Sequence, residues 1–197
     1  TVWATSQTPH TGKMVVAGLL GLDPGDVRVV SPDVGGGFGA KMVEPEAVLV
    51  AWLARTLGRP VRWTETRSEN MLGLPHGRGQ RLSFALGGTR DGKLLAYRLE
   101  VLGDGGAYPA LGAYLPNLTA LMANGVYAIP KVETRTVSVV TNTTPTTSIR
   151  GAGRPEATQA LERAIDLFAA ETGLDPADVR RANFISADAF PYLTPTG

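Results

Sequence analysis

The pattern of apolar residues predicts helices at residues 10–20, 45–57 and 156–172, and capping residues predict a short fourth helix at residues 176–183. In the first and third, apolar side chains return every three or four positions, as in an amphipathic helix with one face on a core. The second is apolar nearly all round, which predicts a buried helix. Gly21 and Gly58 directly follow the first two stretches and are suited to ending a helix. Asp175 and Pro176 suit the N-cap and the first position of the last one.

Other stretches have the β-branched or alternating pattern of strands, at residues 1–6, 27–31, 61–65, 81–86, 94–102 and 132–140. The glycine-rich turn at residues 87–92 joins two of them and predicts a β-hairpin. Residues 103–124 have weak periodicity, and we assign little structure to them. Helices and strands mix without regular alternation, so we expect an α+β fold with a mixed sheet and packed helices.

The composition is that of a globular protein and excludes several classes of function. The chain has 197 residues, 43% of them apolar, which is enough for one large or two small domains. Lys and Arg number 19 against 18 Asp and Glu, so the charge pattern indicates neither a nucleic acid nor a membrane surface as partner. There is no cysteine and there are only two histidines, so we predict no metal ligand within the chain. No apolar run approaches the roughly 18 residues of a membrane span, and we expect a soluble, cytoplasmic protein.

The loop VGGGFGAK, at residues 34–41, follows the predicted strand at residues 27–31. Glycine is required where the backbone takes a positive φ or comes into contact with a bulky group. Each glycine also increases the entropy that is lost when the loop becomes ordered. So many glycines in one loop indicate that another group lies against it.

Two interpretations of this loop follow from local rules. A phosphate-binding loop needs the pattern G-x-x-x-x-G-K-[ST], but Ala40 stands where the second glycine belongs and Met42 where the hydroxyl belongs. Magnesium would then have no hydroxyl ligand, which argues against a phosphate loop. Alternatively, the glycines form a strand bulge and a tight crossing, with Phe38 as an anchor in the core.

A dinucleotide-binding motif is a third interpretation. Gly35, Gly37 and Ala40 formally satisfy G-x-G-x-x-G/A, and Glu65 ends the next predicted strand. In dinucleotide-binding folds the helix starts inside the glycine motif, so that its N-terminus faces the pyrophosphate. Here the predicted helix begins only at Pro45. The match is therefore weak.

A second loop, SIRGAGRPE at residues 148–156, has a similar character. Gly151 and Gly153 lie between Arg150 and Arg154, and the segment leads directly into a predicted helix. Exposed N–H groups, the positive end of the helix dipole and a guanidinium together favour binding of a phosphate or a carboxylate. The simpler interpretation is a turn before a helix with surface arginines. Together, the two loops suggest a large anionic cofactor held by backbone from both sides.

Seven motifs occur in a fixed order along the chain: ATSQTPH, VGGGFGAK, GRPVRWTETRSENM, GDGGAY, GVYAIP, TNTTPTTSIRGAGRPEA and GLDPADVRRANFI. In this order they resemble the molybdopterin-binding large subunit of the xanthine dehydrogenase, aldehyde oxidase and carbon monoxide dehydrogenase family. The resemblance spans essentially the whole chain and is far more specific than a single glycine motif. It covers only a middle part of that subunit. We therefore expect residues 1–197 to be a piece of its molybdopterin-binding region, with further parts on both sides.

The resemblance implies a molybdenum-pyranopterin cofactor (molybdopterin, including its cytosine dinucleotide form) that the chain holds by hydrogen bonds. The cofactor-binding residues that it implies are Gln7, Gly36, Gly37, Phe38, Gly39, Arg150, Gly151 and Ala152. Gln7 matches a glutamine that donates to an oxygen ligand of molybdenum, and an amide suits this role because it donates without adding charge. Phe38 and Gly39 match a loop beside the metal, in which backbone N–H groups meet cofactor oxygens and the aromatic ring shields the site.

At several positions this sequence differs from members of the family whose substrates are known, and these differences limit the classes of substrate that we expect. Met42 stands where xanthine-oxidising enzymes carry a purine-binding glutamate, and Leu118 falls near the place of their substrate arginine. Ala152 replaces a phenylalanine that stacks on the purine, so purine oxidation is not expected at these substrate-proximal positions. Carbon monoxide dehydrogenases carry a copper-binding cysteine where Gly151 stands, and the absence of cysteine effectively excludes that activity.

An aldehyde or N-heterocycle hydroxylase remains, with water as the oxygen source and electrons passing to iron–sulfur and FAD centres on partner subunits or domains. By resemblance the general base is a glutamate beyond Gly197, so we nominate no catalytic residue. Glu44 and Glu46 belong to the start of the second predicted helix, and Glu156 is a favourable charge in a first helical turn. We expect the isolated chain to be inactive without the remainder of the large subunit, an iron–sulfur subunit and a flavin subunit.

Two alternatives from other classes stay open. One is a module that binds NAD or ATP without molybdenum. The other is a structural or assembly domain of the same fold whose loops no longer bind a cofactor.

Overall fold

The computed structural model describes residues 1–42 and 45–197, so Glu44 lies outside the described residues. The chain forms two compact units, residues 1–74 and residues 75–197, and each is described by itself. Among the described residues, no helix combines the length and the apolar character needed to cross a membrane.

The first unit packs two helices beside a short parallel strand pair. Its elements are β1 (Val2–Trp3), α1 (Pro9–Leu20), η1 (Pro24–Asp26), β2 (Val29–Val30), α2 (Pro45–Leu57) and α3 (Arg67–Gly73). Strands β1 and β2 are parallel, and the predicted strand at residues 27–31 is reduced to two residues. Helix α1 ends as expected at Gly21, which has a φ of 62°. The buried core of this unit is small and consists of Val16, Ala17 and Val27, with apolar side chains of α2 against it.

Two expectations for the first unit are wrong. Helix α2 has the predicted bounds but contains no buried residue, and half of the Trp52 side chain is exposed. It packs on the small core through Val48 and Ala51, which occupy only one side of an apolar helix. Residues 61–65 form no strand, because no neighbouring strand in the described chain offers them backbone partners.

Helix α3 was not expected from the apolar pattern. Thr66 accepts a hydrogen bond from the Glu69 N–H, and the Glu69 carboxylate accepts one from the Thr66 N–H. This reciprocal pair is a capping box, and its sequence signature, T-x-x-E, is visible in the chain. The capping rule therefore identifies a short helix that apolar periodicity does not.

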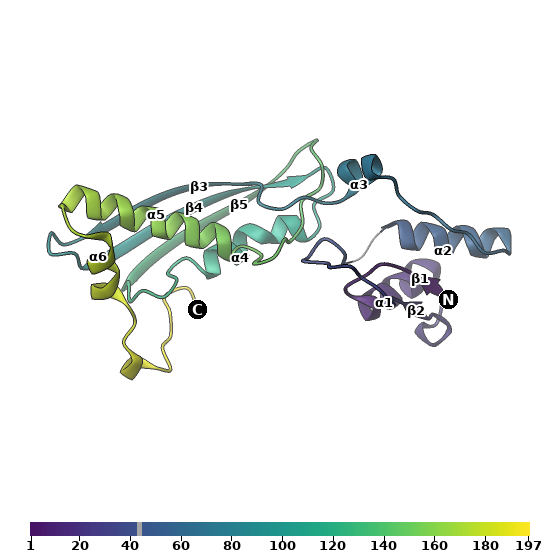
Figure 1. Cartoon of the computed structure of the whole chain (residues 1–197), viewed down its shortest axis with the longest axis horizontal. Helices are drawn as coiled ribbons and strands as arrows, with labels where there is room; N and C mark the ends of the chain where they lie inside the picture. The colour runs from purple at the N-terminus through teal and green to yellow at the C-terminus, as the bar shows by residue number, and fades with distance from the viewer. Residues whose placement is uncertain (43–44) are drawn as a thin grey trace. The chain divides into compact units, whose positions relative to one another are not determined.

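The second unit is a three-stranded sheet with helices on it (Figure 1). Its elements are β3 (Gln80–Gly88), β4 (Leu94–Gly106), η2 (Leu111–Tyr114), α4 (Leu115–Leu121), β5 (Lys131–Val140), α5 (Arg154–Thr172), α6 (Pro176–Asn183) and η3 (Ala187–Ala189). Strands β3 and β4 form the predicted antiparallel hairpin, whereas β4 and β5 are parallel. The sheet is thus mixed, and the expected α+β class is confirmed. Helix α4 lies in the stretch to which little structure was assigned.

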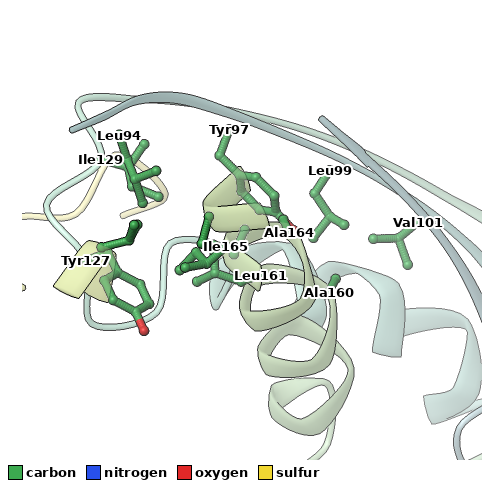
Figure 2. Close-up of a cluster of buried hydrophobic side chains, with 13 residues drawn as sticks. Leu94, Tyr97, Leu99, Val101, Tyr127, Ile129, Ala160, Leu161, Ala164 and Ile165 are labelled. Carbon is green, nitrogen blue, oxygen red and sulfur yellow. The ribbon is translucent and has the colours of Figure 1, made fainter. Parts of the chain in front are cut away.

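The core of the second unit lies between β4 and α5 (Figure 2). Tyr97 and Leu99 point from one face of β4, while Leu161 and Ile165 come from the helix, and all four are essentially fully buried. The strand alternates buried and exposed residues, as a strand with one covered face must. This core fixes α5, and therefore the loop that precedes it.

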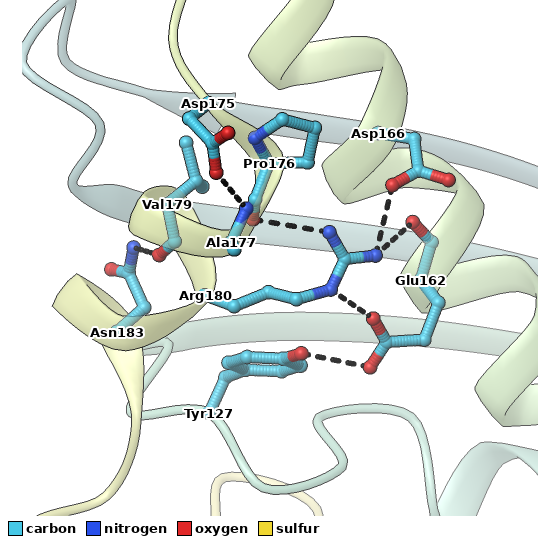
Figure 3. Close-up of polar contacts among 9 residues, drawn as sticks. All are labelled: Tyr127, Glu162, Asp166, Asp175, Pro176, Ala177, Val179, Arg180 and Asn183. Atoms are coloured by element: carbon cyan, nitrogen blue, oxygen red, sulfur yellow. Dashed lines mark hydrogen bonds and ion pairs between the residues drawn. The ribbon is translucent and has the colours of Figure 1, made fainter.

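Helix α6 is held on α5 by a polar cluster (Figure 3). Arg180 donates from Nε to Glu162 at 2.7 Å and from Nη2 to Asp166 at 2.9 Å. Tyr127 donates its hydroxyl hydrogen to Glu162 at 2.8 Å. Burial, together with the Glu162 carboxylate, raises the pKa of Tyr127 to about 12, so the hydroxyl remains a donor at physiological pH.

Candidate cofactor site

The first glycine loop is held by Gln7, which lies between β1 and α1. The Gln7 backbone N–H donates to the Lys41 carbonyl at 2.7 Å. Its side-chain Oε1 accepts from the Gly39 N–H at 2.9 Å. The amide oxygen is therefore used within the loop, and the Nε2 group is the part of Gln7 that remains to donate elsewhere. The sequence predicted Gly39 N–H as a cofactor donor, but here that group is bonded to Gln7.

Close approach explains two of the glycines. A Cβ on Gly37 would lie 2.3 Å from the Gln7 Oε1 atom, and a Cβ on Gly36 would lie 2.7 Å from the Phe38 ring. Gly36 also has a φ of 91°, a conformation that residues with a side chain avoid. The predicted tight crossing is therefore confirmed at Gly37, where the loop backbone lies against the Gln7 side chain. Phe38, however, is 59% exposed, so its interpretation as a core anchor is wrong.

Met42 lies at the far end of the same loop. Its carbonyl accepts hydrogen bonds from the hydroxyls of Ser6, at 2.9 Å, and Thr8. Lys41 donates from Nζ to the Val34 carbonyl and so ties the two ends of the loop together. The structure thus brings Gln7, the glycines and Met42 into one neighbourhood of the first unit.

The geometry does not support a dinucleotide site. The helix after the loop begins at Pro45, so its N-terminus does not open inside the glycine motif. Glu65 ends no strand, so it is not placed as a ribose-binding carboxylate would be. This alternative fails on both of the features that it required.

The second loop lies in the other unit and turns sharply before α5. Ala152 donates its N–H to the Ile149 carbonyl at 2.9 Å, and Arg154 donates its N–H to Gly151 at 3.2 Å. Gly151, Ala152 and Gly153 all have positive φ, of 106°, 45° and 91°. Two of these positions suit glycine, and Ala152 is held at a conformation that is uncommon for a residue with a side chain.

Leu118 is brought beside this loop by α4. A Cβ on Gly153 would lie 2.6 Å from the Thr119 nitrogen and 2.9 Å from the Leu118 Cβ. Glycine is therefore needed at position 153, because the loop backbone lies directly on the helix. Leu118, a predicted substrate-proximal position, thus lies against Gly153, the residue that follows Ala152.

Arg78 is the residue beside this loop that sequence reasoning missed. Its Nη1 donates to both carboxylate oxygens of Glu156 at 3.2 Å, and its Nη2 donates to the Arg150 carbonyl at 2.6 Å. Glu156 is 6% exposed, so it is more than the first-turn charge expected from the sequence. The only signal was an arginine between two glycines in the sequence HGRG, residues 76–79.

Both loops offer hydrogen-bond donors to a ligand. Within the described chain, the N–H groups of Gly36, Gly37 and Gly151 have no acceptor. Beside the second loop, Gln80 Nε2 is buried and has no acceptor in the described part of the chain. Acceptor oxygens, such as those of a phosphate or a pterin, match this donor set. Each loop, taken by itself, therefore fits a cofactor that is held by hydrogen bonds.

These features define a class: an α+β chain whose two units each carry a donor-rich glycine loop of the kind that cofactor-binding proteins use. The molybdopterin cofactor-binding domain family matches residues 1–184, and the chain belongs to that family.

Relatives agree along the whole chain. The carbon monoxide dehydrogenase large chain of Hydrogenophaga pseudoflava is 37% identical over 100% of this chain and 25% of its own length. The 6-hydroxypseudooxynicotine dehydrogenase complex subunit gamma of Paenarthrobacter nicotinovorans is 36% identical over 97% of this chain and 24% of its own. Quinoline 2-oxidoreductase from Pseudomonas putida 86 superimposes with a TM-score of 0.91 at 37% identity, covering 99% of this chain and 25% of that one. The chain thus spans about a quarter of the length of these relatives.

Proposed function

We propose that this chain is part of the large subunit of a molybdenum hydroxylase and forms a wall of its cofactor site. The observation that carries the proposal is the family match over residues 1–184 together with the donors that both loops present. When bound, the molybdenum-pyranopterin would supply the redox chemistry that hydroxylates a substrate carbon with oxygen from water. The protein then acts in the cytoplasm with iron–sulfur and flavin partners that carry the electrons away.

The residues of this chain would bind and orient the cofactor. Gln7 Nε2 would donate to an oxygen of the cofactor, while its Oε1 holds the first loop by accepting the Gly39 N–H. The N–H groups of Gly36 and Gly37 would donate to acceptor oxygens of the cofactor, and the Phe38 ring, which is exposed, would shield the site from water. Arg150 supplies a guanidinium on the second loop, where a phosphate or a pterin oxygen is a suitable acceptor.

The substrate is an aldehyde or an N-heterocycle. At the predicted substrate-proximal positions, the second unit carries the apolar Leu118 and the small Ala152, and the first unit carries Met42. Side chains of this kind suit an uncharged substrate and offer no hydrogen bond to a purine. The likeness to quinoline 2-oxidoreductase supports the N-heterocycle class. Carbon monoxide is not proposed, because Gly151 occupies the expected position of the copper-binding cysteine.

Gln7→Ala and Arg150→Ala in the complete enzyme test the cofactor site. We expect molybdenum content or turnover to fall by roughly tenfold in each variant, because each loses a side-chain donor to the cofactor. Gln159→Ala and Arg163→Ala, at exposed positions of α5, are matched controls and should keep both values. Wild-type metal content and turnover in both test variants would refute the proposal. Calorimetric saturation with NAD or ATP would favour a nucleotide-binding module instead.

A further inference from the structure

Residues 76–79, the sequence HGRG, run beside the segment that leads into the second loop. The His76 N–H donates to the Pro145 carbonyl at 3.0 Å and the Thr147 N–H donates to the His76 carbonyl at 2.8 Å, so His76 and Thr146 form a parallel bridge. Gly77 lies so close to Ile149 that a Cβ would be 2.4 Å from its Cγ2 atom. The segment therefore forms a support along the approach to the loop.

Arg78 extends this support to the loop itself. Its backbone has a φ of 72°, an uncommon conformation for a residue with a side chain. One guanidinium contacts both carboxylate oxygens of Glu156 and the Arg150 carbonyl. Because Glu156 is buried in the first turn of α5, the guanidinium is fixed relative to the helix. The Arg150 carbonyl is fixed in turn.

The direction of this carbonyl determines the direction of the next N–H group. In a trans peptide the C=O and the following N–H point in opposite directions. The Arg150 carbonyl points at Arg78, so the Gly151 N–H points away from it. Gly151 has no Cβ and a φ of 106°, so local sterics alone would allow this peptide to turn over. The Arg78 hydrogen bond selects one of the two orientations.

We propose that Arg78, held by Glu156, is a positioning residue that orients the Arg150–Gly151 peptide so that the Gly151 N–H faces the cofactor. The proposal rests on the proposed function, because it requires a cofactor beside the second loop. A rigid, planar fork is needed to reach a carboxylate and a carbonyl at once. Lysine has a single ammonium group and would hold either partner without fixing both.

The double variant Arg78→Met/Glu156→Met in the complete holoenzyme tests this role. The Glu156 side chain is buried and that of Arg78 is partly exposed, and replacing both members of such a pair with apolar side chains often leaves stability unchanged. The Arg150 carbonyl, by contrast, loses its donor. The matched control is Arg98→Met/Glu133→Met, which removes an exposed ion pair of the same unit. The readouts are molybdenum per protomer, the EPR spectrum of the molybdenum(V) centre and the melting temperature.

We expect the double variant to have the same melting temperature as the control variant. We also expect it to hold roughly tenfold less molybdenum or to give a changed EPR spectrum. Wild-type metal content together with an unchanged spectrum would overturn the proposal. If the double variant does not fold, the single variant Arg78→Lys tests the positioning role instead, because it keeps a positive charge beside Glu156. Reduced metal content or a changed spectrum in a folded Arg78→Lys protein supports the role, and wild-type values for both overturn it.

Gln7→Ala in the same experiment separates this proposal from the proposed function. If Gln7→Ala lowers metal content while the Arg78 variants match the wild type, only the positioning role of Arg78 fails. If Gln7→Ala and Arg150→Ala leave metal content and turnover unchanged, the proposed function fails.

Discussion

In the first loop, the Gln7 side chain fills the space that a side chain at position 37 would need. A Cβ at position 37 would overlap the Gln7 amide, which lies 2.3 Å from the place of that atom. The amide needs this space because its oxygen accepts the Gly39 N–H. Glycine at position 37 is thus required by a neighbouring side chain, and the same contact orients the donor end of Gln7.

Asp104 gives a second example of a single residue that holds a turn. It lies near the end of β4, in the motif GDGGAY, and accepts hydrogen bonds from the Thr141 hydroxyl at 2.7 Å, the Gly106 N–H at 2.9 Å and the Thr143 hydroxyl at 3.0 Å. These bonds, that from Thr141 first, lower the pKa of Asp104 below its ordinary value of 3.8. The lower pKa stabilises the folded chain as long as the carboxylate is ionised.

We therefore predict an acid-dependent loss of stability that Asp104→Asn removes in part. The folded-state pKa is depressed, so the stabilisation is fully present above 3.8 and is lost as pH falls through the lower folded value. Urea unfolding between pH 7 and pH 3 should show a smaller decline for Asp104→Asn than for the wild type. Asp188→Asn, at an exposed position, should retain the wild-type decline. Equal pH dependence in all three proteins would contradict this account.

At the scale of elements, one buried side-chain amide, that of Asn183, holds the end of the short helix α6 against the β3–β4 hairpin. Asn183 Oδ1 accepts the Leu94 N–H at 2.9 Å, and its Nδ2 donates to the carbonyls of Gly92 and Val179 at 2.8 and 2.7 Å. Asn183 is 4% exposed. One side chain therefore joins the hairpin turn to the end of α6.

Replacing this amide should be costly. Asn183→Ala leaves the Leu94 N–H and the Gly92 carbonyl buried without a hydrogen-bond partner. We therefore expect the free energy of unfolding to fall by about 3 kcal/mol. Chemical denaturation of the full chain measures this change. Asn142→Ala removes an exposed amide and should change stability by less than about 0.5 kcal/mol. A loss at position 183 no larger than that at position 142 would show that the amide does not fix α6.

At the scale of the whole molecule, the two units differ in the size of their cores. Among the described residues, thirteen buried ones form the cluster between the sheet and α5 of the second unit, against three in the first. The first unit also exposes large apolar side chains on its helices, Trp52 and Leu49 among them. Small units with little buried apolar surface are marginally stable.

We expect residues 75–197 to unfold cooperatively as an isolated fragment and residues 1–74 to give no cooperative transition. Thermal unfolding followed by circular dichroism would measure both fragments, with the full chain as reference. A sigmoidal transition for residues 1–74, or its absence for residues 75–197, would show that buried core size does not set the stability of these units.

The sequence by itself determined helices α1, α2, α5 and α6, the hairpin, the mixed α+β class and the positions of both glycine loops. These features depend on neighbours a few positions apart or on motifs that keep their order, and both are visible in a linear chain. It left the nature of the loops open, because glycine patterns are shared by bulges, phosphate loops and dinucleotide folds.

Only the tertiary structure decided which distant residues meet. It exposed α2, although its composition predicts burial, and it left residues 61–65 without strand partners. It also joined Arg78 to Glu156 across 78 positions of the chain. A guanidinium and a carboxylate at that separation leave no periodic pattern in the sequence. Their pairing depends on the packing that places α5 beside the segment before β3.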